Sequence, residues 1–103
     1  MQLTGTRPAL WMEFRRRQEG MQHALEGGLW LHRFRLREEP MAHLVSSDRD
    51  LLLRVGQRLD VRPEWLQYKP LKLPSTGERL PAWHWDLRGL YLERAVAQAS
   101  PQR

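Results

Sequence analysis

The stretch that decides the fold is residues 29–46, LWLHRFRLREEPMAHLVS. Apolar and basic residues alternate over 29–37 with the two-residue period of a β-strand. A second short apolar stretch follows at 41–46, and Glu38-Glu39-Pro40 between the two is typical of a turn. The sequence therefore predicts a β-hairpin. One face of its first strand would carry Trp30, His32, Phe34 and Leu36, and the other face Arg33, Arg35 and Arg37.

Helical patterns flank this hairpin on both sides. Residues 8–26 place Leu10, Trp11 and later apolar residues near helical spacing, with Thr6 as a cap and Pro8 in the first turn. Gly27-Gly28 would end that helix. A second helix is expected from Ser47, as its cap, to Asp60. Its buried face would consist of Leu51, Leu52, Val55 and Leu59.

The last third of the chain is predicted to begin with loops and short strands. Prolines interrupt residues 66–82, and Ser75-Thr76-Gly77 is typical of a turn. A third helix is expected after Asp86, ending near Ala99 and burying Leu87, Leu90, Tyr91, Ala95 and Val96. We therefore predict one α/β or α+β domain, in which an N-terminal helix (1–28) joins a compact core (29–100). A short sheet built on 29–46 and 65–82 would be packed by about three helices.

Composition excludes several classes of function. The chain has 103 residues, five tryptophans and no cysteine, so disulfides, thiolate catalysis and cysteine-ligated metals are excluded. No apolar run approaches the roughly 18 residues of a membrane span, and the N-terminus does not resemble a signal peptide. We expect a cytoplasmic protein without membrane contact.

A net charge of +5 favours anionic partners, and DNA or RNA is the expected one. The surplus lies in residues 1–37 and 61–103, whereas 38–60 is acidic. Arginine far outnumbers lysine, a bias that is also typical of GC-rich genomes. Two sets of cations are candidate phosphate ligands, the strand face Arg33, Arg35 and Arg37 and the segment that contains Lys69, Lys72 and Arg79.

Each set has a structural alternative. Charged residues protect an edge strand against aggregation, which is an equally good explanation of the three arginines. The second set is interleaved with Tyr68, Trp83 and Trp85, as in proteins that stack single-stranded bases on aromatic rings. Burial of those tryptophans in the core, with the lysines in solvent, is favoured over base stacking.

His43, His84 and Asp86 are the candidate metal ligands. In a strand His84 and Asp86 would share one face, and with His43 opposite them they would form a ligand set for a divalent metal. The favoured alternative makes Asp86 the N-cap of the third helix and His43 a core histidine. No serine lies in a glycine-flanked elbow, and no glycine-rich phosphate loop is present.

Residues 41–67 and 83–99 resemble a bacterial and phage family, domain of unknown function 4031. The resemblance rests on MAHLVSSD, the helix through Val55 and Leu59, VRPEWLQ and HWDLRG. It implies a compact α/β fold and implies no activity. Three features depart from the family pattern: an opening strand with paired aspartates is missing, Leu53 stands where a histidine is common, and the loop between Gln67 and His84 is longer. The family positions are matched by His43, Trp65, Gln67, His84, Trp85 and Asp86.

Three functions follow as expectations. The leading one is a nucleic-acid-associated accessory domain that uses the two cation sets. The first alternative is a metal-dependent hydrolase, such as a nuclease, in which His43, His84 and Asp86 hold the cation that activates water. The second is a protein-interaction module or homodimer with tryptophans at its interface.

Overall fold

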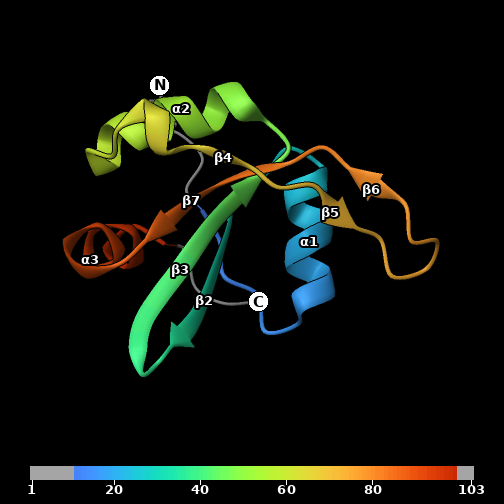
Figure 1. The fold of residues 1–103 in the computed structure, drawn as a ribbon, viewed down its shortest axis with the longest axis horizontal. Helices are drawn as coiled ribbons and strands as arrows, with labels where there is room; N and C mark the ends of the chain where they lie inside the picture. Colours follow the sequence, from blue (N-terminus) through green and yellow to red (C-terminus); the bar gives the residue numbers. More distant parts are fainter. Residues whose placement is uncertain (1–10, 100–103) are drawn as a thin grey trace, which may run out of the picture.

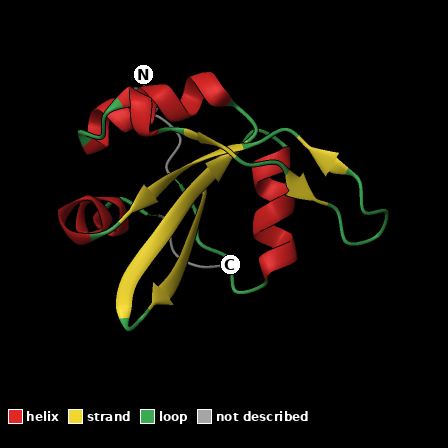
Figure 2. Ribbon diagram, viewed as in Figure 1, coloured by secondary structure: helices red, strands yellow, loops and turns green. Residues whose placement is uncertain are grey.

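In the computed structural model, which describes residues 11–99, the chain forms one α+β domain. A four-stranded antiparallel sheet has the order β2-β3-β7-β4, and a separate two-stranded ribbon pairs β5 with β6 (Figures 1 and 2). The predicted fold class is confirmed. The elements are α1 (Arg17–Leu25), β2 (Trp30–Leu36), β3 (Glu39–Ser46), α2 (Arg49–Leu59), the 3₁₀ helix η1 (Pro63–Trp65), β4 (Gln67–Tyr68), β5 (Leu71–Lys72), β6 (Arg79–Leu80), β7 (Trp83–Leu87) and α3 (Gly89–Ala97).

The predicted hairpin is present as β2 and β3, paired from Trp30↔Val45 to Leu36↔Glu39. Its turn is one residue earlier than expected and consists of Arg37 and Glu38, with φ angles of 51° and 71°. Two-residue hairpin turns of this type need positive φ at both central residues, because their twist matches that of the strands. Arg37 therefore belongs to the turn, and the predicted three-arginine strand face is reduced to two residues.

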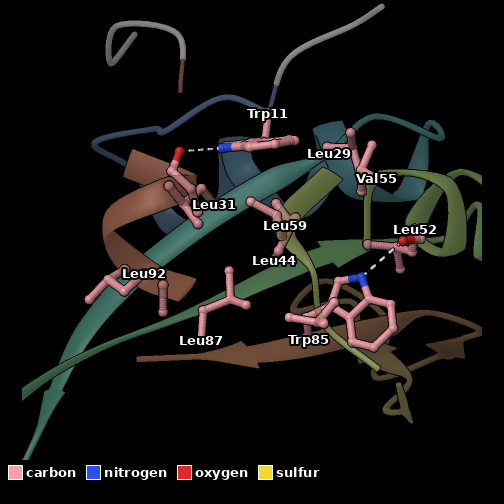
Figure 3. Close-up of a cluster of buried hydrophobic side chains, with 13 residues drawn as sticks. Trp11, Leu29, Leu31, Leu44, Leu52, Val55, Leu59, Trp85, Leu87 and Leu92 are labelled. Atoms are coloured by element: carbon pink, nitrogen blue, oxygen red, sulfur yellow. Dashed lines mark hydrogen bonds between the residues drawn. The ribbon is translucent and has the colours of Figure 1, made fainter. Parts of the chain in front are cut away.

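The prediction of a helix over residues 8–26 is wrong for residues 11–16, and α1 begins only at Arg17. Met12 instead bridges to β2 in parallel: its N–H donates to the Leu29 carbonyl, and its own carbonyl accepts from Leu31. Trp11 is fully buried, and its indole N–H donates to the Ala95 carbonyl (Figure 3). Pairing with the edge of the sheet and burial of this indole outweigh the local helical preference. The predicted residues Thr6, Pro8 and Leu10 lie outside the described part of the chain.

The main core lies between one face of the sheet and the helices α2 and α3. Asp48, rather than the predicted Ser47, caps α2: its carboxylate accepts from the Leu51 N–H at 3.0 Å. The Trp85 indole N–H donates to the Leu52 carbonyl at 2.9 Å, which ties β7 to α2 (Figure 3). The largest fully buried side chains of this core are Trp11, Leu29, Leu31, Leu44, Leu52, Leu59, Trp85 and Leu87.

The region around Asp86 differs most from expectation. Asp86 lies inside β7, and α3 begins at Gly89, so the prediction that Asp86 caps this helix is wrong. The reason is that β7 runs between β3 and β4 and pairs with both. Leu90, expected to be buried, is 56% exposed. Of the predicted strand region 65–82, only β4 joins the sheet.

The second face of the sheet is covered only in part, by α1 and by the β5–β6 ribbon. In Figure 1 both lie to the right of the sheet, and the tip of the β2–β3 hairpin extends below the helices. The backbone of α1 comes close to the sheet at Gly20, where an added Cβ would overlap the Trp30 indole. Trp30, Met21, Ala24, Val45 and Ala82 form a small second core there. None of the helices in the described part is long and apolar enough to cross a membrane.

Replacing Leu44 by alanine tests the main core. Leu44 is fully buried on the central strand β3, so Leu44→Ala should lower the free energy of unfolding by about 2–5 kcal/mol. Leu36→Ala is the matched control, because Leu36 is 54% exposed on the same hairpin and should change it by less than about 0.5 kcal/mol. Urea denaturation measures both. Equal losses in the two variants would contradict this assignment of the core.

Candidate metal centre

Strand pairing brings the three predicted metal ligands onto one face of the sheet. His43 in β3 lies directly opposite Asp86 in β7, and His84 precedes Asp86 by two residues, so its side chain points to the same face. The short strand β4 places Gln67 opposite His84. The sequence leaves two alternatives for Asp86, the N-cap of the third helix or a strand residue beside His84. In the structure Asp86 is a strand residue.

The two histidine side chains converge on one carboxylate oxygen of Asp86. Asp86 Oδ1 lies 3.0 Å from His43 Nε2 and 3.2 Å from His84 Nε2. The two imidazole rings are stacked, with centroids 4.3 Å apart and planes inclined by 30°. His84 is buried, whereas His43 and Asp86 are partly exposed. Two fixed imidazoles and a solvent-accessible carboxylate therefore converge on one small volume.

These three side chains could supply the ligands of a divalent metal. One ligand atom from each residue lies within 4.8 Å of the other two. Zinc bonds to nitrogen and oxygen of about 2.0–2.2 Å place neighbouring tetrahedral ligands about 3.3 Å apart, close to the two distances from Asp86 Oδ1. Three protein ligands leave a fourth position for water or substrate, as in catalytic zinc sites. Two histidines and one carboxylate also suit ferrous iron.

Burial favours the neutral form of both imidazoles. Burial lowers the pKa of His43, the adjacent His84 lowers it further, and Asp86 raises it in part. Burial also lowers the pKa of His84, against the raising effect of Asp86. A lowered pKa favours the neutral imidazole, which is the form that coordinates cations.

Gln67 and His32 surround these ligands. The Gln67 side-chain amide donates to Asp86 Oδ2, which orients the carboxylate so that Oδ1 faces the imidazoles. In the sequence only the family resemblance singles out Gln67. His32 lies opposite His43 in β2 and stacks on Trp30, with centroids 4.8 Å apart. The alternation in residues 29–37 places His32 on this face of the sheet, but the site prediction missed it.

A basic groove adjoins the candidate site and is lined by His32, His43 and His84. It holds about 450 Å³, within the range of small-molecule sites. Its cations are Lys69, Lys72 and Arg79, which the sequence predicts as phosphate ligands, and Arg17 of α1, which it missed. Arg17 lines the groove because α1 lies over this face of the sheet, a contact that the sequence pattern does not predict.

The hairpin arginines are held in other ways. Arg33 forms a bidentate ion pair with the buried Glu13: its Nε donates to Oε1 at 2.8 Å and its Nη2 donates to Oε2 at 3.2 Å. Arg35 donates to the Glu38 carbonyl, and Arg37 lies in the turn. None of these three arginines lines the basic groove. The structure therefore separates the predicted cations into two groups and places only the second beside the histidines.

The two tryptophans of the predicted base-stacking segment differ in burial. Trp85 is buried in the main core, as the favoured alternative expects, and Trp83 packs at its margin. Tyr68 is exposed and contacts Trp83 edge-on, with centroids 5.3 Å apart.

Comparison of the chain with protein families, with curated proteins and with solved structures found no match. The resemblance to the domain of unknown function 4031 family therefore stays a prediction. Four of the six residues that carry it lie at or beside the metal centre: His43, Gln67, His84 and Asp86.

Zinc titration of the metal-free protein by calorimetry tests the centre. We expect one zinc ion per chain. Because Gln67 only orients Asp86, Gln67→Ala should weaken zinc binding about 10–100-fold. His84→Ala and Asp86→Asn remove a ligand or its charge and should weaken it more. Asp86→Asn keeps the size of a partly exposed side chain, so it separates ligand loss from misfolding.

His32→Ala is the matched control for this titration. His32 lies in the same groove, next to His43, but outside the group of three ligand atoms. Zinc affinity should be unchanged in this variant. Equal losses in His32→Ala and Asp86→Asn would rule out the assigned ligands.

Proposed function

We propose that this domain is a divalent-metal-dependent phosphodiesterase that acts on nucleic acid. The observation that carries the proposal is the position of His43 and His84 in the wall of a groove with four cations, with Asp86 paired to both imidazoles. Among the described residues that line this groove, none is acidic. A negatively charged chain of phosphates is the partner that such a surface attracts.

The roles of the residues follow from their positions. His43, His84 and Asp86 would hold the cation, which polarises a phosphoryl oxygen and lowers the pKa of bound water towards 7. Gln67 would fix the carboxylate through its bond to Asp86 Oδ2. Arg17, Lys69, Lys72 and Arg79 would bind phosphates on either side of the scissile bond.

The accessory-domain alternative uses the same groove without chemistry. It predicts salt-dependent binding of DNA or RNA and no cleavage, so one set of assays distinguishes the two. The cytoplasmic location expected from the sequence would give either one access to nucleic acid.

The interaction-module alternative loses several of its candidate contacts. Trp11, Trp30 and Trp85 are buried within the chain. An interface or homodimer would therefore depend on the exposed large apolar side chains of the described residues, Leu36, Trp65, Tyr68 and Leu90. Light scattering at high protein concentration tests self-association directly.

Cleavage of a labelled single-stranded oligonucleotide, with added zinc or manganese, tests the proposed function. The wild-type chain should cleave it, and a chelator should abolish cleavage. Asp86→Asn should lose activity but still bind the oligonucleotide, because the four groove cations remain. Cleavage that persists in Asp86→Asn would contradict the proposal and indicate a contaminating nuclease, and binding without cleavage by the wild type would favour an accessory domain.

Salt dependence of oligonucleotide binding, measured by fluorescence anisotropy, is the second part of this test. Lys69→Ala/Lys72→Ala should weaken binding and reduce the slope of log Kd against log salt by about 0.7 per lost phosphate contact. The matched control is Arg35→Ala/Arg37→Ala, which removes the same charge from the hairpin outside the groove. A larger effect of the control would move the binding surface to the hairpin.

A further inference from the structure

A second hollow lies on the other side of Asp86, between η1, β4 and the start of α3. We call it the aromatic hollow, because Trp65 and Tyr91 form part of its wall. Trp65 is 44% exposed, an unusual position for the largest apolar side chain. The other residues that line the hollow are Glu39, Glu64, Gln67, Asp86, Arg88, Gly89 and Leu90.

The aromatic hollow and the basic groove meet at the metal centre. Asp86 lines the hollow, while the two imidazoles bonded to it line the groove. Gln67 also faces the hollow and donates to the same carboxylate. A ligand that occupied both depressions would therefore pass directly over the three proposed metal ligands.

The two depressions differ in charge. The basic groove has four cations and no acidic lining residue. The aromatic hollow has three carboxylates, those of Glu39, Glu64 and Asp86, and its cation Arg88 lies 3.6 Å from Glu39. Phosphates would be repelled from the hollow and attracted to the groove, whereas an uncharged flat ring meets no such repulsion.

Trp65 is held in place by its neighbours. The edge of its ring system meets Tyr91, with centroids 5.9 Å apart and planes at 84°. The Arg62 guanidinium lies 5.9 Å from the Trp65 centroid and is itself fixed by Glu64 at 2.7 Å. An oriented and partly exposed indole costs little conformational entropy when a second ring stacks on it.

We infer that the substrate is single-stranded nucleic acid, with its phosphates in the basic groove and an unpaired base stacked on Trp65. This inference rests on the proposed function and names the substrate of the same site. Bases within a duplex are already stacked and paired, so they reach an aromatic side chain only after extrusion. Proteins that bind single strands combine a cationic groove with exposed aromatic rings in the same way.

Affinities of the full chain for two probes test the inference, in a chelator so that no cleavage occurs. The probes are a labelled oligothymidine and an abasic oligomer of equal length, which has the phosphates without the bases. Wild type should bind oligothymidine more tightly. Because stacking on one aromatic ring is worth at least about a five-fold change in affinity, Trp65→Ala should lose that factor for oligothymidine and keep its affinity for the abasic oligomer.

Two variants control for structure. Trp65→Phe keeps a ring and should retain most of the preference for bases. Leu36→Ala alters an exposed aliphatic residue that lines neither depression and should leave both affinities unchanged. Thermal unfolding of each variant shows whether the domain remains folded, as expected because η1 contains no buried residue.

The outcomes separate this inference from the proposed function. Equal wild-type affinity for the two probes, or an equal loss for both in Trp65→Ala, would overturn base stacking and leave a phosphate-binding metal site standing. Failure of the wild type to bind either probe at low salt would overturn the nucleic-acid function as well. A preference for the probe with bases supports the inference for DNA and RNA alike. Comparing the affinities for oligothymidine and oligouridine then shows which kind of strand the protein binds more tightly.

Discussion

In the antiparallel pair formed by β3 and β7, His43 faces Asp86 and Val45 faces His84. Side chains alternate between the faces of a sheet, so a slip of one residue would turn the imidazoles of β3 and β7 to opposite faces. Burial of Leu44 and Trp85, a cross-strand pair on the core face, specifies this register. The packing of the core therefore fixes the geometry of the site on the reverse face.

The two faces of the sheet are covered to different extents. One face is closed by α2 and α3, and buried indoles donate hydrogen bonds to the Ala95 and Leu52 carbonyls there. The other face is covered only in part: α1 and the β5–β6 ribbon leave His43 and Asp86 partly exposed, whereas His84 is buried. The larger core therefore lies on one side of the sheet, and the smaller core on the other.

Local patterns predict local structure, and they fail where distant contacts decide. Alternation in residues 29–37 and the spacing of Leu52, Val55 and Leu59 predict the hairpin and α2, because their signals lie within single elements. The position of Trp11 depends on Ala95, 84 residues away, so nothing near Trp11 predicts an extended segment. Asp86 followed by Leu-Arg-Gly is typical of a helix start, and only pairing with both β3 and β4 makes it part of a strand. The three candidate ligands could be proposed from their chemistry, but their convergence depends on strand pairing between β3 and β7, which local sequence patterns do not show.

Anomalous diffraction from crystals grown with zinc tests whether His43, His84 and Asp86 bind a metal, because it locates the metal without reference to activity. The account predicts one strong peak at the zinc edge, at bonding distances of about 2.0–2.2 Å from nitrogen and oxygen ligands. These ligands should be His43 Nε2, His84 Nε2 and Asp86 Oδ1. A strong peak at other residues, or none at this site at saturating zinc, would contradict the account.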